Sequence, residues 1–224
     1  MSNDEQEQER LDIHHHLIVL LLGGKLHLAP ISSTPHRVLD LGTGTGIWAI
    51  DFADEYPSAQ VIGNDLSPIQ PANVPPNLTF VVDDIEDYWG YEKVPFDYVH
   101  ARYLAASIRD WPGLVRQAFR NIKPGGWVEF QEWDYEIQCL DNSLTPEHDL
   151  WKWHQYTCSR LISAGIDPYP GLKLENYVRD AGFTNVKAHI YAIPLGTWPK
   201  DPRYVSHNLA HSAPFPRGSV SRAR

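Results

Sequence analysis

The sequence predicts an α/β protein whose core is a parallel β-sheet. Short apolar segments of strand length alternate along the chain with segments of helical periodicity. The first strand candidate, 37–41, runs directly into a glycine-rich turn that opens a helix. This alternation is typical of right-handed βαβ units, which build parallel sheets covered by helices. With 224 residues, 42% of them hydrophobic, the chain is long enough for one domain with a substantial core.

The N-terminal part is expected to contain two helices around the first strand. Residues 1–10 are polar, and we expect them to be flexible. Residues 11–22 have helical character and end at Gly23-Gly24, a pair that favours a helix C-terminus. A second helix over 47–56 follows the glycine-rich turn.

The middle of the chain contains the remaining parallel strands. We expect these strands over 60–65, 78–82, 96–101 and 127–132. Before the last of them, residues 114–123 show an amphipathic pattern with Leu114, Ala118 and Ile122 on one helical face. The Pro-Gly-Gly that follows ends this helix.

The C-terminal part is expected to add two helices and one strand. These elements are the helices over 146–163 and 172–181 and a sixth strand over 185–193. Residues 204–224 contain no acidic residue and no strand pattern, so we expect a disordered, divergent tail. The predicted organisation is therefore a flexible N-terminus over 1–10, a domain over 11–203 and a tail over 204–224.

Charge and cysteine content exclude several classes of protein. Nineteen Lys and Arg against 28 Asp and Glu give a net charge of −9, which disfavours direct nucleic-acid binding because phosphates are held mainly by cations. Cys139 and Cys158 are too few for a disulfide framework or a four-cysteine zinc site, so we expect an intracellular protein. The longest aliphatic run, 17–22, is far shorter than the roughly 20 residues of a membrane span, and we expect no membrane partner.

The glycine-rich turn after the first strand carries the clearest chemical signal. Residues 38–46 read VLDLGTGTG, so the glycines are spaced G-x-G-x-G and not G-x-G-x-x-G as in dinucleotide-binding proteins. Glycines let the backbone turn sharply and let a ligand approach closely. Asp40 precedes these glycines. Its carboxylate would oppose a pyrophosphate but would suit a ligand with an ammonium group, such as S-adenosylmethionine.

Acidic residues also follow the next two strands. Asp65 ends the second strand, where an acid can accept hydrogen bonds from both ribose hydroxyls. Asp84 and Ile85 follow the third strand, where the acid can accept from an adenine amino group while the isoleucine covers the ring. Because open α/β sheets bind ligands at the carboxyl ends of their strands, these positions together predict an S-adenosylmethionine site. A nicotinamide enzyme or a Rossmann-like domain without a ligand are the alternatives.

In these motifs, the chain resembles the class I S-adenosylmethionine-dependent methyltransferases. VLDLGTGTG, the acid after the second strand and NIKPGGWVEFQEWD carry this resemblance. The strings GKLHLAPI, DLSPIQP and WPKDP are narrower and resemble the fungal LaeA-like methyltransferases. The resemblance implies a doubly wound, Rossmann-like sheet in three αβα layers and a transferase that uses S-adenosyl-L-methionine.

The resemblance also assigns residues to this cofactor. The positions that match the family's binding residues are Asp40, Gly42, Thr43, Gly44, Gly46, Asp65, Leu66, Asp84, Ile85 and His100. The glycine turn would hold the methionine part, Asp65 and Leu66 the ribose and adenine, and His100 would line the cofactor cleft after the fourth strand.

The sequence identifies no catalytic base. The candidates follow the fourth and fifth strands and are His100, Arg102, Tyr103, Glu132 and Asp134. A base is needed only where the nucleophile starts protonated, so the catalytic residue stays open.

Two clusters of rings invite other interpretations. His14, His15 and His16 are consecutive on a helix, about 100° apart, and cannot share one metal ion. We therefore expect no metal site and one histidine that faces the cofactor cleft. The aromatic residues of the helix over 146–163 fit either a helix core or an aromatic substrate pocket.

The resemblance implies a link to fungal secondary metabolism, whose best-known regulators of this family are nuclear. It leaves the methyl acceptor open between a small metabolite and a protein, and the location open between cytoplasm and nucleus. A regulatory role would require protein partners, since the chain is acidic. The family's last strand lies antiparallel beside the fifth, and we expect it to be missing here because the C-terminus is divergent or truncated. This departure makes a catalytically inactive, methyltransferase-like regulatory or binding module the alternative function.

Overall fold

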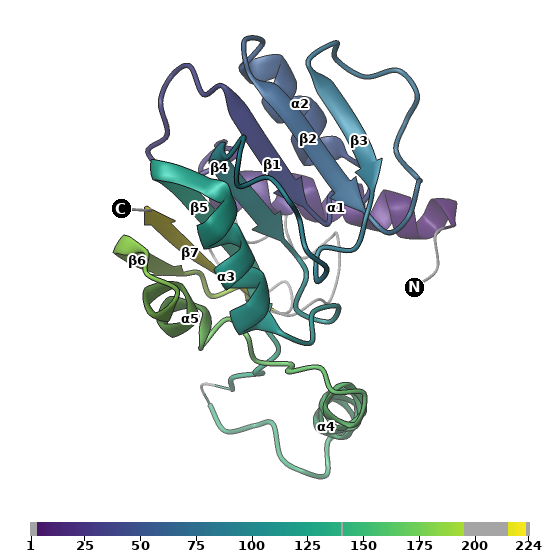
Figure 1. Ribbon diagram of the computed structural model, residues 1–224. Coiled ribbons are helices and arrows are strands. Elements are labelled where there is room, and N and C mark those ends of the chain that lie inside the picture. The colour runs from purple at the N-terminus through teal and green to yellow at the C-terminus, as the bar shows by residue number, and fades with distance from the viewer. Residues whose placement is uncertain (1–3, 140, 195–214, 223–224) are drawn as a thin grey trace.

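The computed structural model describes residues 4–139, 141–194 and 215–222, which form one sheet with helices on both faces (Figure 1). The helices are α1 (Glu5–Leu21), α2 (Ile47–Glu55), α3 (Trp111–Asn121), α4 (Asp149–Ser163) and α5 (Leu174–Asp180). The strands are β1 (Arg37–Leu41), β2 (Gln60–Asp65), β3 (Leu78–Val82), β4 (Phe96–Arg102), β5 (Ile122–Asp134), β6 (Thr184–Ile190) and β7 (Phe215–Arg222).

The sheet has the strand order β3-β2-β1-β4-β5-β7-β6. Strands β1 to β5 pair in parallel, and β1 lies between β2 and β4. The strand order therefore reverses between β1 and β4, at the kind of switch point where open α/β sheets bind ligands. The predicted doubly wound α/β fold is confirmed.

Strand β7 corrects the expectation that the last strand is missing. It lies antiparallel between β5 and β6 and pairs with both. Its sequence, FPRGSVSR, has a proline, a glycine and no alternating apolar pattern, so propensity alone did not reveal it. Pro216 pairs only with β5, whereas residues 217–220 pair with both neighbours, and this pairing overrides their weak strand propensity. Residues 204–214 and 223–224 of the expected tail lie outside the described residues.

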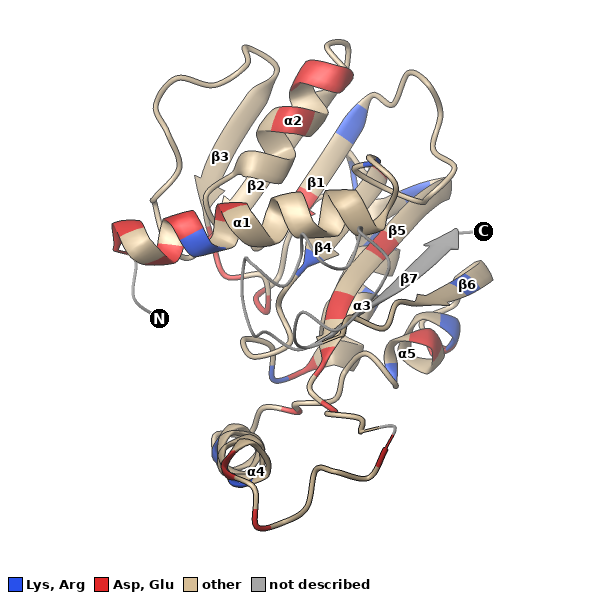
Figure 2. Cartoon of the chain, turned by 180° about the vertical axis from the view of Figure 1, so that it is seen from behind, with Lys and Arg blue, Asp and Glu red and all other residues tan. Residues whose placement is uncertain are grey.

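Helix α1 starts earlier than expected and corrects the prediction of a flexible segment up to residue 10. Asp4 caps the helix, because its side chain accepts a hydrogen bond from the Glu7 N–H. Glu5 and Glu7 lie in the first turn, where acidic side chains favour the helix dipole. Figures 1 and 2 show α1 running across the strands near their carboxyl ends, on the same face as α2. Residues 1–3 lie outside the described part of the chain.

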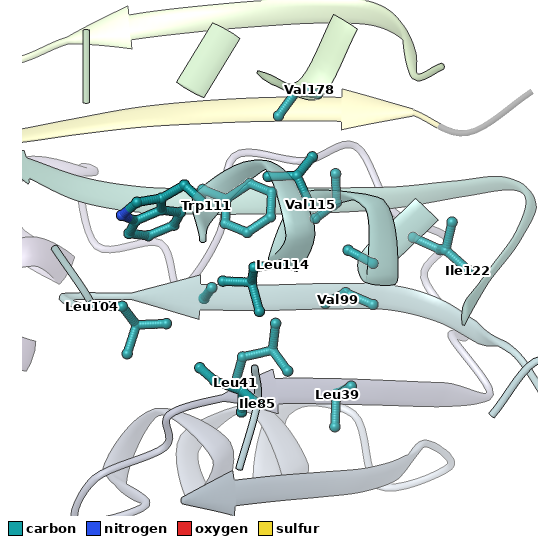
Figure 3. Packing of buried hydrophobic residues seen from close by; sticks show 14 of the residues in the cluster. Leu39, Leu41, Ile85, Val99, Leu104, Trp111, Leu114, Val115, Ile122 and Val178 are labelled. Carbon is teal, nitrogen blue, oxygen red and sulfur yellow. The ribbon is translucent and has the colours of Figure 1, made fainter. Parts of the chain in front are cut away.

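The side chains of β1 alternate between two hydrophobic clusters, one on each face of the sheet. Leu39 and Leu41 pack with α3 on one face, and this cluster includes Trp111 and Leu114 (Figure 3). Val38 packs with α2 on the other face. Because strand side chains alternate, Asp40 points to the α2 face, where α1 also lies.

The charged residues of α1 and α2 are mainly acidic, and Figure 2 shows these acidic residues in red. This distribution agrees with the net charge of −9. Among the described residues, no helix combines the length and hydropathy needed to cross a membrane.

Replacing Leu114 by alanine should lower the free energy of unfolding by about 2–5 kcal/mol, as expected for a buried leucine. The Leu114 side chain is 2% exposed and lies between α3 and the sheet. Urea denaturation measures the change. Leu20→Ala is the matched control, since Leu20 is 58% exposed on α1 and its loss should cost at most about 0.5 kcal/mol. Equal small effects of the two substitutions would contradict this packing.

Candidate active site

A cavity of about 510 Å³ lies between α1 and the carboxyl ends of β1, β2 and β4. Its walls come from α1, the glycine turn after β1, the loop after β2 and the segments that follow β4 and β5. This is the switch point of the sheet, so the fold itself positions the cavity.

The glycine turn forms one wall with backbone and little side chain. Gly42, Gly44 and Gly46 have φ angles of 61°, 58° and 82°, a region that favours glycine. A Cβ at Gly42 would collide with the Leu104 side chain. Gly46 is the N-cap of α2, so the glycine turn ends at the amino end of that helix.

A buried pair, Asp40 and His100, lies next to this turn. The two residues are opposite each other in the register of β1 and β4, and His100 Nδ1 lies 2.7 Å from Asp40 Oδ1. The Thr43 hydroxyl donates to Asp40 Oδ2 over 2.6 Å. The Trp48 ring stacks on the imidazole at 3.7 Å with a 7° angle between the planes. One carboxylate thus orients both the histidine and the start of the turn.

Helix α1 is tied to the cavity floor through His15. His15 Nε2 lies 2.9 Å from Asp51 Oδ2 on α2, and Arg102 Nη2 lies 2.8 Å from His15 Nδ1. Burial, together with the charge of Arg102, lowers the pKa of His15 to about 3, so this imidazole is neutral. Burial lowers the pKa of Arg102 to about 10, and the guanidinium stays charged near neutral pH.

Aromatic rings form the opposite wall. The rings of His14, Tyr103 and Trp133 lie within 4.8–5.9 Å of one another in tilted or edge-on contacts. Arg10 Nη1 donates to the Tyr103 hydroxyl over 2.9 Å, and its guanidinium lies over the same ring. Burial raises the pKa of Tyr103. This end of the cavity is therefore apolar with one cation at its rim.

Asp65 organises the loop after β2. Its Oδ2 accepts from the Gly44 N–H at 2.8 Å and its Oδ1 from the Ser67 N–H at 2.9 Å. The adjacent Leu66 side chain is 66% exposed and lines the cavity. The second strand thus presents an acid and an apolar surface beside the glycine turn.

Comparison with known proteins assigns the chain to a family. Residues 13–188 match the family described as "Methyltransferase domain". The chain belongs to this methyltransferase domain family. It is 44% identical over 205 residues to methyltransferase pytC of Aspergillus terreus, across 90% of this chain and 62% of the relative. It is 40% identical over 203 residues to protein-methionine methyltransferase laeA of Emericella nidulans, across 88% of this chain and 53% of the relative.

A solved structure supports the same fold. Phosphoethanolamine N-methyltransferase 2 of Haemonchus contortus, in complex with S-adenosyl-L-methionine, matches with a TM-score of 0.61 and 18% identity, covering 93% of this chain and 52% of that one. The predicted resemblance to class I and LaeA-like methyltransferases is confirmed. This methyltransferase domain spans less than two thirds of the length of the two curated relatives described above.

Most of the residues that the sequence assigned to the cofactor border the cavity of the methyltransferase domain. Those that line it are Asp40, Gly42, Thr43, Gly44, Asp65, Leu66 and His100. Gly46, Asp84 and Ile85 are not among the described lining residues. Ile85 packs into the core beside α3 (Figure 3), and Asp84 Oδ1 accepts from the Glu86 N–H. The third strand thus contributes less to this cavity than expected.

The candidate bases of the methyltransferase domain divide into two groups. His100, Arg102 and Tyr103 line the cavity, whereas Glu132 and Asp134 are buried and are not among its described lining residues. Glu132 accepts hydrogen bonds from the Leu104 and Ala105 N–H groups, and burial raises its pKa to about 8. This contact makes Glu132 a support for the loop after β4.

Helix α1 contributes more residues to the cavity than the sequence predicted. It expected one histidine to face the cleft, whereas both His14 and His15 are buried and line it. Arg10 was not predicted at all, because its partner Tyr103 lies 93 residues away in the chain. No local spacing signals such a contact.

The aromatic helix α4, for which the sequence left a helix core and a substrate pocket open, has both exposed and buried side chains. Trp153 and Tyr156 are 54% and 62% exposed, whereas His154 and Cys158 are buried. None of its residues is among the described lining residues. No group of three metal-ligating side chains occurs in the described part of the chain.

Substituting His15 by glutamine should reduce the loss of stability that acid causes. The folded protein keeps His15 neutral down to about pH 3, whereas histidine in an unfolded chain takes up its proton near pH 6.5. The unfolded state therefore binds the extra proton between these values, and the stability falls as the pH drops from 6.5 towards 3.

Urea unfolding at about pH 7.5 and about pH 5 measures this difference. His16→Gln, on the exposed side of the same helix, is the matched control, and the effect of His15→Gln should be larger. A wild-type pH dependence in His15→Gln would contradict a neutral, buried His15.

Proposed function

We propose that the protein is an S-adenosylmethionine-dependent methyltransferase of LaeA-like type, linked to fungal secondary metabolism. The observation that carries this proposal is the cavity at the switch point, which brings the glycine turn, the Asp40–His100 pair and Asp65 together. The family membership and the curated relatives support it.

The groups around the cavity fit this cofactor. The glycine turn leaves room for a ligand to approach the backbone, and Asp65 lines the cavity with carboxylate oxygens that can accept hydrogen bonds from ribose hydroxyls. His100 Nε2 is buried beside the cavity and has no hydrogen-bond partner among the described residues. Leu66 offers an apolar surface for adenine, and Asp84 and Ile85 would contribute only after local rearrangement.

When bound, the cofactor supplies an electrophilic methyl group on a sulfonium sulfur. The protein's task is to orient the nucleophile and to exclude water. Helix α1 covers the cavity, and His14, Tyr103 and Trp133 give it an apolar wall. Trp48 and Asp40 hold His100 in one orientation.

Two of the candidate bases, Glu132 and Tyr103, are better suited to positioning than to base catalysis. Glu132 is engaged by two backbone N–H groups, and the Tyr103 hydroxyl is held by Arg10. A thioether nucleophile carries no proton and needs no base, and one relative is named a protein-methionine methyltransferase. The acceptor we propose is a protein or a small metabolite, and the transfer of labelled methyl groups into protein or small-molecule fractions distinguishes the two.

The inactive-module alternative rested on the missing last strand, which β7 supplies. A regulatory role would act through protein partners, because α1 and α2 are acidic (Figure 2). We place such a protein in the cytoplasm or the nucleus, and a fluorescent fusion would tell the two apart.

Asp65→Ala should weaken S-adenosylmethionine binding by roughly 10- to 100-fold, because about 1.5–3 kcal/mol is lost with hydrogen bonds to a charged group. Titration calorimetry measures the dissociation constant. Asp54→Ala, an exposed acid on α2, is the control and should bind like the wild type. Unchanged affinity in Asp65→Ala would show that the ribose site is misplaced. If the wild type does not bind S-adenosylmethionine, the proposed function is wrong.

A further inference from the structure

Two residues of strand β4 that line the cavity each carry a buried polar atom without a hydrogen-bond partner in the described part of the chain. His100 Nε2 and Arg102 Nη1 are both buried and have no hydrogen-bond partner among the described residues. The two residues are two positions apart on one strand, so they share a face of the sheet, and both line the cavity. Buried polar atoms without partners are costly, which points to a ligand that supplies the missing partners.

The hydrogen bond between His100 and Asp40 determines whether His100 Nε2 is a hydrogen-bond donor or acceptor. Asp40 is a carboxylate and only accepts, so the hydrogen lies on His100 Nδ1. In the neutral ring, Nε2 is then an acceptor. Both Asp40 oxygens are already engaged, one by His100 and the other by the Thr43 hydroxyl. Asp40 therefore influences the cavity by orienting the imidazole.

Arg102, in contrast, has a hydrogen-bond donor without a partner among the described residues. A guanidinium only donates, so His15 Nδ1 accepts from Arg102 Nη2, and His15 Nε2 donates to Asp51. The neutral state of His15 agrees with this arrangement. His15 of α1, itself held by Asp51 of α2, thus binds one end of the guanidinium and leaves Nη1 as a charged donor.

The neighbouring Arg10, also in the cavity wall, is already engaged. Arg10 forms a 2.5 Å ion pair with Glu7 and donates to the Tyr103 hydroxyl. It is therefore less available than Arg102 for a charged ligand. The acceptor at His100 and the donor at Arg102 are the complementary pair that the site leaves open.

We propose that His100 and Arg102 bind the α-amino-acid end of S-adenosylmethionine, with His100 Nε2 accepting from the ammonium and Arg102 Nη1 donating to the carboxylate. This inference rests on the proposed function and assigns the zwitterionic end of the cofactor to two residues of β4. Asp40 then acts as a positioning residue for His100, and His15 as a positioning residue for Arg102. The contact of α1 with the cofactor site becomes part of cofactor recognition.

A crossed set of ligands and variants tests the assignment by binding alone. The ligands are S-adenosylhomocysteine, its analogue without the carboxylate, 5′-S-(3-aminopropyl)-5′-thioadenosine, and its analogue without the ammonium, 5′-S-(3-carboxypropyl)-5′-thioadenosine. The variants of the full chain are Arg102→Met, which removes the donor, and His100→Asn, which keeps an N–H for Asp40 but removes Nε2.

Arg102→Met should weaken the binding of the two carboxylate-bearing ligands by roughly 10- to 100-fold, the range for a charge-assisted hydrogen bond. The affinity for the aminopropyl ligand should stay within about twofold of the wild-type value. His100→Asn should weaken the binding of the two ammonium-bearing ligands and leave the binding of the carboxypropyl ligand unchanged. Arg102→Lys, which keeps a cation, should recover part of the lost affinity. Arg116→Met, an exposed arginine of α3, is the matched control and should change no affinity.

Equal losses for all three ligands in a variant would overturn the assignment for that residue, since a structural role does not distinguish them. If Arg102→Met fails to fold, as judged by its thermal transition without ligand, Arg102→Lys decides: a selective loss for carboxylate ligands supports the assignment, and a uniform loss or no change overturns it. Wild-type binding of S-adenosylhomocysteine with no ligand-selective loss in the variants would refute this inference but leave the proposed function intact. Failure of the wild type to bind any of the three ligands would refute both.

Discussion

The hydrogen bond between Asp40 and His100 is the interaction on which the site depends. It joins the two central strands at the point where the strand order reverses, and both side chains are nearly inaccessible to solvent. A charged group in such a place is stable only when its hydrogen bonds are satisfied. The Thr43 hydroxyl supplies the second of these bonds, which links the carboxylate to the glycine turn. The conformation of the turn and the orientation of the imidazole are therefore set together.

Helix α1 extends this arrangement from the sheet to the roof of the cavity. Asp12 accepts a hydrogen bond from Thr45 in the glycine turn, and His15 bridges α2 and β4. The helix is held by polar contacts as well as by packing of Ile18, which is 4% exposed. Polar contacts of this kind are specific in geometry but modest in net energy. They suit a segment that must fit closely over a site and still allow a ligand to enter.

The sequence predicted the centre of the fold much better than its ends. The bounds of β1, β2 and β3 agree with the prediction, because apolar runs, turns and glycines are local signals. Strand β7 escaped prediction because pairing on both sides, and not propensity, stabilises it. The site shows the same division: the glycine turn and Asp65 are local features, whereas the contact between His15 and Arg102 joins residues 87 positions apart. Ile85 was assigned to the site from its position after β3, but its apolar side chain packs into the core.

The position of β7 determines the order in which the sheet can be completed during synthesis. Both of its neighbours, β5 and β6, are made before it, yet they do not pair with each other. Until residues 215–222 emerge, β5 has an unpaired edge beside its completed parallel neighbour, and such edges invite pairing with other chains. A chain in which β7 has not yet paired therefore exposes an edge of β5 that β7 covers in the seven-stranded sheet.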